Sequence, residues 1–550
     1  MFTLDPYAAR SCPVKTHNSF HPGVVRPEQG AGHGRLPGSA EFIAATYDRI
    51  IAGDASVVDL RTLAGEPSED QEAACLSAMA AGTQVIIGGL LPRDWVAHRS
   101  GRADLLVRDA AGGYFPGLVK YQRVLDARKG EVESTFSPVA ALPERYTALG
   151  WRYRWHWRTG NAVQLAHLWH LLGPLGQQAV TRPLACIVGS DEVDDQGLRA
   201  IWLDLAEPVV APAPAQDADN GLVSALDRYA FEFRARVQLA EAAGAAAVTD
   251  PPLLRPVVSY ECGYCPWWST CRPQLDDDDL SLRISKSPLD VHEISVLREA
   301  GVATVAQLAV SDLDLLLPDY LPLVAHRSGA EERLRLAQRR SQLLTEGVEL
   351  ERTTTGPIEV PAAPLEIDID VETSREDRVY LWGFWVADGN GGGSYQEFSS
   401  FTDLDDAAER ALAGAAMTWL RDLIGSGEAH VYHYSDYEMV RLGRLAKCEP
   451  TLDWAMDFAR AHFVDLFPTV RQNFFGTNGL GLKVMASAGA GFHWRDDDPG
   501  GLNSMRWFEE AVHAPSKDAR ERARTRVLEY NEDDVRATWH LRRWLRTLGD

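Results

Sequence analysis

Between residues 364 and 440, apolar and polar positions alternate along the chain in a way that predicts a β-sheet. The segment PLEIDIDVET puts four apolar residues on one face of a first strand and four carboxylates on the other: Leu365, Ile367, Ile369 and Val371 against Glu366, Asp368, Asp370 and Glu372. Two further strands are expected in RVYLWGFWVAD and GGSYQEFSSF, a helix over about 404–424, and a fourth strand in AHVYHY. A long final helix is expected in ERARTRVLEYNEDDVRATWHLRRWLRTL. Residues 364–550 are therefore predicted to form an α/β domain.

The rest of the chain divides into two more regions. Residues 1–280 alternate helical and strand-like stretches, and residues 283–350 predict a helical module with a turn at Gly301 and a second short helix from Thr304. A linker rich in Pro and Thr is expected at 351–363. The predicted fold class is α/β multidomain.

Composition narrows the class of protein. The 550 residues are 45% hydrophobic and 24% charged, which excludes wholesale disorder, and no apolar run reaches the roughly 18–20 residues that span a bilayer. The start MFTLDPYAAR lacks a basic stretch followed by an apolar one, so we expect no signal peptide and a cytoplasmic protein. The net charge of −23 argues against non-specific coating of nucleic acid, which uses a basic excess. Any nucleic-acid contact would need a local basic groove or bound metal cations.

Three of the seven cysteines lie close together, and this spacing indicates a metal site. Cys262, Cys265 and Cys271 fall within ECGYCPWWSTC, and seven cysteines in 550 residues are too few for a disulfide scaffold. Tetrahedral iron or zinc takes a fourth ligand, for which Cys12 in the polar segment RSCPVK is the candidate. Iron–sulfur, zinc and no metal at all remain open on the residues alone.

Carboxylates in the last region predict a second metal site. Asp370 and Glu372 end the first strand, and Tyr530 and Asp534 are neighbours on one face of the final helix because they are four residues apart. Two-metal phosphoryl transfer needs several carboxylates around two cations, and a tyrosine beside them can orient the attacking water. Taken alone, DVET is equally typical of a strand end at the surface.

These motifs resemble those of DEDD-type exonucleases, which have an RNase H-like fold, and specifically the DEDDy class with its tyrosine. DVET matches the first motif and YNEDDV the third, while HYSDYE offers Glu438 where the family has an aspartate. The resemblance implies Mg²⁺ or Mn²⁺ held by Asp370, Glu372, Glu438 and Asp534, with Tyr530 orienting the water. It also implies 3′ to 5′ polarity. Asp465 in FVDLFPTV is a candidate for a supporting or structural role.

In the first region, Asp104 lies in QVIIGGLLPRDWVAHRSGRADLLVRD and Lys120 lies in YFPGLVKYQRVL. These segments resemble the RecB nuclease fold, which is restriction-endonuclease-like. Asp104 and Lys120 match an aspartate and the lysine of D/E-x-K, but position 118 is Leu118 rather than an acid. Gln164 matches the start of Q-x-x-x-Y, although position 168 is Leu168, and His33 is a candidate for the family histidine. Without the carboxylate at 118 the resemblance implies a degenerate site. A weakened working site and a plain salt bridge from Asp104 remain open.

Two further resemblances concern cofactor and nucleic acid. One remote cysteine plus a three-cysteine cluster resembles the iron–sulfur staple of RecB-type nucleases, which implies a [4Fe–4S] cluster on Cys12, Cys262, Cys265 and Cys271, with zinc as the alternative. The turn at Gly301 resembles a helix-hairpin-helix element, which binds phosphates, although a plain helical linker domain shows the same pattern.

The segment WRYRWHWRTG offers a candidate contact with nucleic acid. It interleaves Arg152, Arg154 and Arg158 with aromatic residues, as single-strand grooves do. Read as a strand, it puts the aromatic residues on one face and the arginines on the other. The same pattern suits a half-buried strand with solvated arginines.

Together these parts resemble the family of RecB-like putative nucleases, which sometimes carry a fused helicase. The resemblance implies a metal-dependent 3′–5′ exonuclease acting on single-stranded DNA ends in DNA repair, recombination or defence, with a helicase as an expected partner. The alternatives are a non-catalytic iron–sulfur subunit that binds nucleic acid within a helicase or repair complex, and an RNA-processing exonuclease. No G-x-x-x-x-G-K-[ST] motif occurs, so ATP hydrolysis by this chain is not expected.

Overall fold

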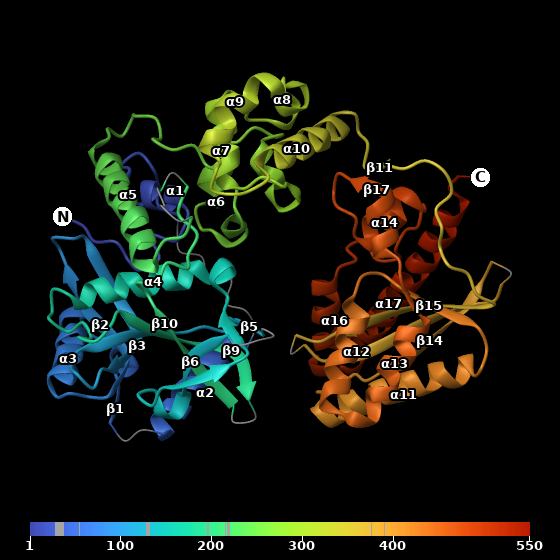
Figure 1. The fold of residues 1–550 in the computed structure, drawn as a ribbon, viewed down its shortest axis with the longest axis horizontal. Coiled ribbons are helices and arrows are strands. Elements are labelled where there is room, and N and C mark those ends of the chain that lie inside the picture. Colours follow the sequence, from blue (N-terminus) through green and yellow to red (C-terminus); the bar gives the residue numbers. More distant parts are fainter. Residues whose placement is uncertain are drawn as a thin grey trace. The chain divides into compact units, whose positions relative to one another are not determined.

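The structure is a computed structural model that describes residues 1–27, 38–53, 56–127, 132–194, 197–214, 216, 221–375, 377–389 and 391–549. The chain forms two units (Figure 1). The first contains Met1–Gln307 and Ser311–Leu336, and the second contains Leu308–Val310 and Ala337–Asp550. The predicted RecB-like region and most of the helical module thus share the first unit. No helix in the described part of the chain is long and apolar enough to cross a membrane.

The first unit is built on a mixed eight-stranded sheet with the order β1-β2-β3-β4-β9-β10-β6-β7. Its strands are β1 (Val57–Asp59), β2 (Val85–Asp94), β3 (Arg99–Arg108), β4 (Tyr114–Val119), β6 (Glu133–Pro138), β7 (Tyr146–Leu149), β9 (Leu184–Asp194) and β10 (Gly197–Asp204). A separate antiparallel pair joins β5 (Leu125–Ala127) to β8 (Trp151–Tyr153). The central strands are almost wholly buried, because helices cover them and apolar residues run along them without interruption.

Helices pack on this sheet and on one another. They are α1 (Pro13–Phe20), α2 (Ser39–Gly53), α3 (Ser68–Ala80), α4 (Trp155–Leu172), α5 (Ala225–Ala245) and the short α6 (Trp268–Cys271). The helix α4 contacts β2, β3 and β4, and α5 packs against α4 and α1 (Figure 1). Residues near the N-terminus are thereby brought beside α5.

The segment WRYRWHWRTG is not one strand, so neither interpretation that reads it as a strand applies to its whole length. Only Trp151–Tyr153 are extended, and α4 starts at Trp155, so the aromatic residues and arginines do not alternate between two faces. The aromatic residues of the run alternate with a period of 2, but a pattern of only seven residues is a weak guide to secondary structure. The burial of the α4 stretch that follows decides in favour of helix.

The helical module has the predicted helix–glycine–helix arrangement. Its helices are α7 (Val291–Glu299), α8 (Val305–Val310), α9 (Leu313–Leu323) and α10 (Ala330–Thr345). Gly301 has φ = 84°, a conformation that favours glycine, and it turns the chain between α7 and α8. The carboxylate of Glu293, fully buried in α7, is held by Arg327 and Arg333 at 2.8 and 2.7 Å.

The second unit contains a five-stranded sheet with the order β14-β13-β12-β15-β16. Its strands are β12 (Leu365–Thr373), β13 (Val379–Ala387), β14 (Gly393–Ser399), β15 (Ala429–His433) and β16 (Phe463–Asp465), and β11 (Leu350–Arg352) pairs separately with β17 (Phe474–Gly476). Its helices are α11 (Asp406–Ile424), α12 (Tyr437–Cys448), α13 (Asp453–His462), α14 (Phe467–Asn473), α15 (Leu482–Val484), α16 (Gly501–His513) and α17 (Lys517–Thr547). The predicted strands, the helix near 404–424 and the long final helix are all present.

The predicted linker at 351–363 is partly a packed segment. Ile358 and Val360 are 6% and 9% exposed and belong to a buried cluster with Leu541 and Leu545 of α17. The segment has the Pro-rich composition of a linker, but its two aliphatic side chains are buried against the end of the final helix.

The central strand β12 has one aliphatic and one acidic face, as the alternation predicts, and α17 covers the acidic face. Ile367, Ile369 and Val371 pack in a core with α11 and α12. On the acidic face, Arg542 Nε lies 2.9 Å from Asp368, and Arg546 Nη2 lies 2.7 Å from Glu366. The first two carboxylates are therefore neutralised by arginines of α17, whereas the last two carboxylates of the strand lie beyond the reach of these arginines.

Candidate active site

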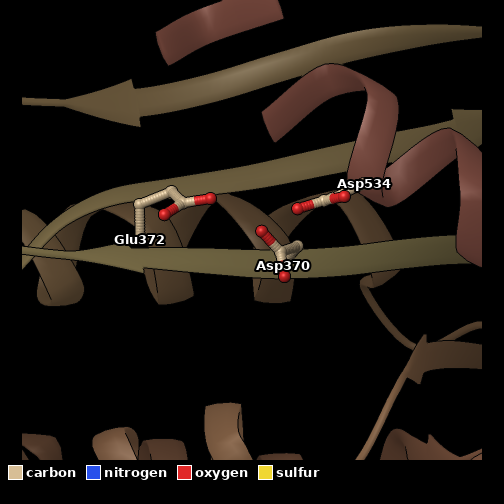
Figure 2. A group of neighbouring side chains, drawn as sticks. All are labelled: Asp370, Glu372 and Asp534. Carbon is tan, nitrogen blue, oxygen red and sulfur yellow. The ribbon is translucent and has the colours of Figure 1, made fainter. Parts of the chain in front are cut away.

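Asp370, Glu372 and Asp534 converge where β12 passes beneath α17 (Figure 2). Each offers one carboxylate oxygen, and these oxygens all lie within 4.8 Å of one another. In the described part of the chain, no other group of three His, Cys, Asp or Glu residues meets this criterion. Asp370 and Glu372 share a face because they are two residues apart in a strand, and Asp534 reaches them from the buried side of the helix.

The three carboxylates open into a cavity that all five predicted catalytic residues line. Glu438 and Tyr530 complete that set, and Tyr434, Tyr437 and Lys483 also line the cavity. Glu438 lies in the first turn of α12, directly after β15. His433 Nδ1 lies 3.4 Å from Glu438 Oε2 but is hydrogen bonded to the Ser435 carbonyl at 2.5 Å, so this oxygen has no hydrogen-bond donor among the described residues.

Each carboxylate of the group has a neutral donor that sequence reasoning missed. Asn531 Nδ2 donates to Asp370 Oδ2 at 2.7 Å, the Ser504 hydroxyl donates to Glu372 Oε2 at 2.7 Å, and Trp494 Nε1 donates to Asp534 Oδ1 at 2.7 Å. These donors come from α16, α17 and the loop before α16. Neutral donors orient carboxylates without neutralising them, so the negative charge of the site is retained.

The shifts in pKa show that the site is short of positive charge. Burial, and then the charges of Asp534, Glu372 and Glu438, raise the pKa of Asp370 well above its usual value. Burial and the charge of Asp534 raise the pKa of Glu372 to about 8. By contrast, the pKa of Glu366 is held down at about 2: burial acts to raise it, but the hydrogen bond from Arg546 and the charge of Arg542 outweigh burial. Carboxylates in such a state are the oxygen ligands that divalent cations prefer.

Lys483 is the cation of the cavity lining, and the sequence did not single it out. Its Nζ donates to the Tyr530 hydroxyl oxygen at 2.8 Å and lies 4.8 Å from the centre of that ring. Burial and the charge of Asp534 raise the pKa of Tyr530 far above its usual value, so its hydroxyl keeps its proton. Lys483 occupies a lone pair of this oxygen, and the Tyr530 O–H is hydrogen bonded to the Asp534 carboxylate.

Two nearby acidic residues have structural partners. Asp465 Oδ1 accepts from the backbone N–H groups of Ser435 and Phe467, both at 2.9 Å, and so shapes the turn after β15. Asp533 accepts from Arg495. Both side chains therefore fix backbone near the site, and neither lines the cavity.

In the first unit, Asp104 and Gln164 line another cavity, together with Asp5 and Glu72. Asp104 Oδ2 accepts from Val119 N–H at 3.0 Å and lies 3.9 Å from Lys120 Nζ, while Gln164 accepts from Arg10 at 3.1 Å. Leu105 pairs with Gly117, and this antiparallel register sets Asp104 opposite Leu118. Leu118 and Leu168 are fully buried in the apolar core. His33 lies outside the described residues.

The four predicted cysteine ligands line one small cavity of the first unit. Cys12 caps the start of α1, and it is brought to Cys262, Cys265 and Cys271 together with an apolar lining that includes Val14, Trp267 and Trp268. Burial, followed by the charges of the other three cysteines, raises the pKa of the Cys271 thiol to about 11. Ser259 N–H donates to Cys262 Sγ at 3.3 Å, and Asn18 Nδ2 to Cys271 Sγ at 3.9 Å. The sulfurs are spread more widely than the carboxylate group, since no three of them lie within 4.8 Å of one another.

The three predicted nucleic-acid arginines lie near residues 123–126 but have different surroundings. Arg152 lines a cavity with Tyr153 and Trp155, whereas Arg154 pairs with Asp126 at 2.6 Å and Arg158 Nε donates to the Arg123 carbonyl at 2.9 Å. Two of the three thus have structural partners.

Comparison with known proteins bears on the second unit. Residues 367–546 match the family model of the RNase_H superfamily. The C-terminal domain is RNase H-like. This match begins in β12 and ends in α17, so it includes all five residues predicted to be catalytic. A search of curated proteins gave no match, and neither did a search of solved structures. The RNase H-like domain and its acidic trio together indicate a nucleic-acid hydrolase.

The raised pKa values predict how stability depends on pH when metal is removed. An unfolded Glu titrates at about 4.3, whereas folded Glu372 titrates at about 8, so between these values only the folded state holds this proton. Stability in EDTA should therefore fall as the pH rises through this window, by up to about 1.4 kcal/mol per pH unit for each such proton. Thermal unfolding of the second unit, followed by calorimetry at several pH values, measures the slope. Adding Mg²⁺ or Mn²⁺ should flatten it, and a slope of the opposite sign would contradict the electrostatics described above.

Proposed function

We propose that this protein is a metal-dependent nuclease, and specifically a 3′–5′ exonuclease that acts on single-stranded DNA ends in DNA repair, recombination or defence. The observation that carries the proposal is the convergence of Asp370, Glu372 and Asp534 in a cavity of an RNase H-like domain, where none of the three forms an ion pair with a described basic residue. The polarity and the preference for DNA rest on the resemblance to DEDDy exonucleases.

The donor set suits Mg²⁺ or Mn²⁺. Asp370, Glu372, Glu438 and Asp534 would hold two cations, since hard divalent cations take carboxylate oxygens. Glu438 Oε2 accepts no hydrogen bond within the described residues, although His433 Nδ1 lies 3.4 Å away. Bound there, the cations would stabilise the attacking and leaving oxygens of phosphoryl transfer. Tyr530, whose hydroxyl is held between Lys483 and Asp534 at the edge of the carboxylate group, would orient the attacking water. Ser504, Trp494 and Asn531 would keep the carboxylates in place.

For the first unit we propose a [4Fe–4S] cluster held by Cys12, Cys262, Cys265 and Cys271. Burial raises the pKa of the Cys12 and Cys271 thiols, and the charges of neighbouring cysteines raise it further, so a cation among the sulfurs would favour their thiolate forms. Sulfurs around one tetrahedral zinc are about 3.8 Å apart, given Zn–S bonds of about 2.3 Å. The wider spread of these sulfurs favours the larger cluster over zinc. The N–H donors to Cys262 and Cys271 are of the kind that tune such clusters.

The site at Asp104, Lys120 and Gln164 is proposed to be a degenerate nuclease site. The position where a second metal-binding acid is expected is Leu118, which is packed in the core. Asp104 already accepts from Val119 N–H and lies beside Lys120. In this proposal the first unit serves as a scaffold that binds nucleic acid, with Arg152 as a contact and a helicase as partner.

A second candidate function is a non-catalytic subunit that binds nucleic acid through the same units. The replacement of the family aspartate by Glu438 favours it, because a longer side chain changes the spacing of the cations.

The deciding assay incubates single-stranded DNA oligonucleotides labelled at the 5′ or the 3′ end with the full-length protein and Mn²⁺. A 3′–5′ exonuclease should release the 3′ label at once as a mononucleotide and shorten the 5′-labelled strand progressively. Binding without shortening of either strand would select the non-catalytic subunit. If an RNA oligonucleotide of the same sequence were degraded faster than the DNA, the preferred substrate would be RNA rather than DNA.

A further inference from the structure

Gly383 lies opposite Asp370 on the neighbouring strand and leaves a slot beside it. In the antiparallel pairing of β12 with β13, Asp370 is the partner of Gly383, which stands between the buried residues Trp382 and Phe384. A glycine inside a strand weakens the strand and often marks a place where another group approaches closely. A Cβ atom at position 383 would lie 1.7 Å from Asn531 Oδ1, so no other residue fits here unless Asn531 moves.

Asn531 of α17 fills this slot and makes two hydrogen bonds there. Its side chain is fully buried; Nδ2 donates to Asp370 Oδ2 at 2.7 Å, and Oδ1 accepts from the Tyr395 hydroxyl at 2.8 Å. The Tyr395 donor fixes the amide, because the amide oxygen must face the hydroxyl and the NH₂ group must then face the carboxylate. Tyr395 comes from β14, so three strands and the helix α17 meet at this amide.

We propose that Asn531 is a positioning residue that orients Asp370 for metal binding, and that Gly383 and Tyr395 hold Asn531 in place. The inference rests on the proposed function of this site. Asp370 Oδ2 is engaged by Asn531, and Oδ1 accepts no hydrogen bond from the described residues. One oxygen of Asp370 points toward Glu372 and Asp534 and the other points away (Figure 2). The amide therefore holds the carboxylate in one rotamer and leaves one oxygen for the cation.

Neutrality matters at this position. A lysine or arginine in the slot would pair with Asp370 and compete with a cation, as Arg542 does at Asp368 on the same strand. An amide donates a hydrogen bond and brings no net charge. Losing such a partner of a metal-binding carboxylate typically weakens metal affinity by about 10- to 100-fold.

The test measures Mn²⁺ affinity of the full-length protein by electron paramagnetic resonance, without nucleic acid. Asn531→Ala should raise the Mn²⁺ dissociation constant by about 10- to 100-fold. Tyr395→Phe should weaken binding by less, and the double variant Asn531→Ala/Tyr395→Phe should be no weaker than Asn531→Ala alone, since Tyr395 acts through the amide. Gly383→Ala should also weaken Mn²⁺ binding. In the Asn531→Ala background, where the slot is empty, it should raise the Mn²⁺ dissociation constant by a smaller factor. Asn473→Ala, which removes an amide that bonds Thr354 and Thr469 away from the cavity, is the matched control and should bind Mn²⁺ like the wild type.

The outcomes separate this inference from the proposed function. Unchanged Mn²⁺ affinity in Asn531→Ala would overturn the inference, but it would not contradict the proposed nuclease function. Strictly additive losses from Asn531→Ala and Tyr395→Phe would also overturn it, since a purely structural contribution gives that result. Wild-type protein that binds Mn²⁺ but degrades no nucleic acid would reject the proposed function, and the affinities would still decide the role of Asn531. Wild-type protein that binds no Mn²⁺ would overturn both.

Discussion

Asp370→Asn should abolish metal-dependent degradation of nucleic acid without destabilising the protein. The substitution keeps the shape of the side chain but removes one of the charges that would hold the cations. We expect this to remove several kcal/mol of transition-state stabilisation, which lowers the rate of cleavage at least about a thousandfold. Because burial and three neighbouring carboxylates oppose ionisation of Asp370, its neutral replacement should leave the melting temperature in EDTA unchanged or higher.

Asp457→Asn provides the matched control for this experiment. Asp457 is also in the second unit, but it is exposed on α13, and among the described residues its ion-pair partner is Arg460. It should keep wild-type activity, because exposed pairs of this kind contribute little. If Asp370→Asn degraded oligonucleotides at the wild-type rate, the proposed site would be wrong, even if the protein proved to be a nuclease.

Cys12→Ser should remove the bound iron and strongly lower the stability of the first unit. Cys12 stands at the start of α1 and is separated by 250 positions from Cys262, so a metal centre shared by the two closes a very long loop. Losing a cross-link of this length should lower the melting temperature of the first unit by about 10 °C. Protein purified without oxygen should change from brown to colourless, with a matching loss of iron by elemental analysis.

The control variant for Cys12→Ser is Cys75→Ala. Cys75 is fully buried in the apolar core of the first unit, remote from the cysteine cavity, so its replacement should retain colour and iron. A colourless wild-type protein that contains stoichiometric zinc would show that the site binds zinc rather than an iron–sulfur cluster. Wild-type protein with neither metal would reject the proposed centre altogether.

The local sequence determined four strands and two helices of the second unit and the residue types of its chemistry. Alternation over PLEIDIDVET predicted β12 with its acidic face, and the spacing of Tyr530 and Asp534 predicted that they share one side of a helix. Such patterns are informative because backbone geometry alone sets periods of 2 and 3.6. The match to the RNase H superfamily confirmed the domain that these motifs indicated. The roles of the individual residues remain predictions.

Only the tertiary structure decided which carboxylates of β12 are free for chemistry. Glu366 and Asp368 look like Asp370 and Glu372 in the sequence, but the first pair meets Arg542 and Arg546, and the second meets Asn531 and Ser504. These partners are more than 130 positions away along the chain, and no local pattern encodes where a distant helix will pack. The segment WRYRWHW shows the same limit, because its alternation is typical of a strand, whereas packing makes it helical from Trp155 onward.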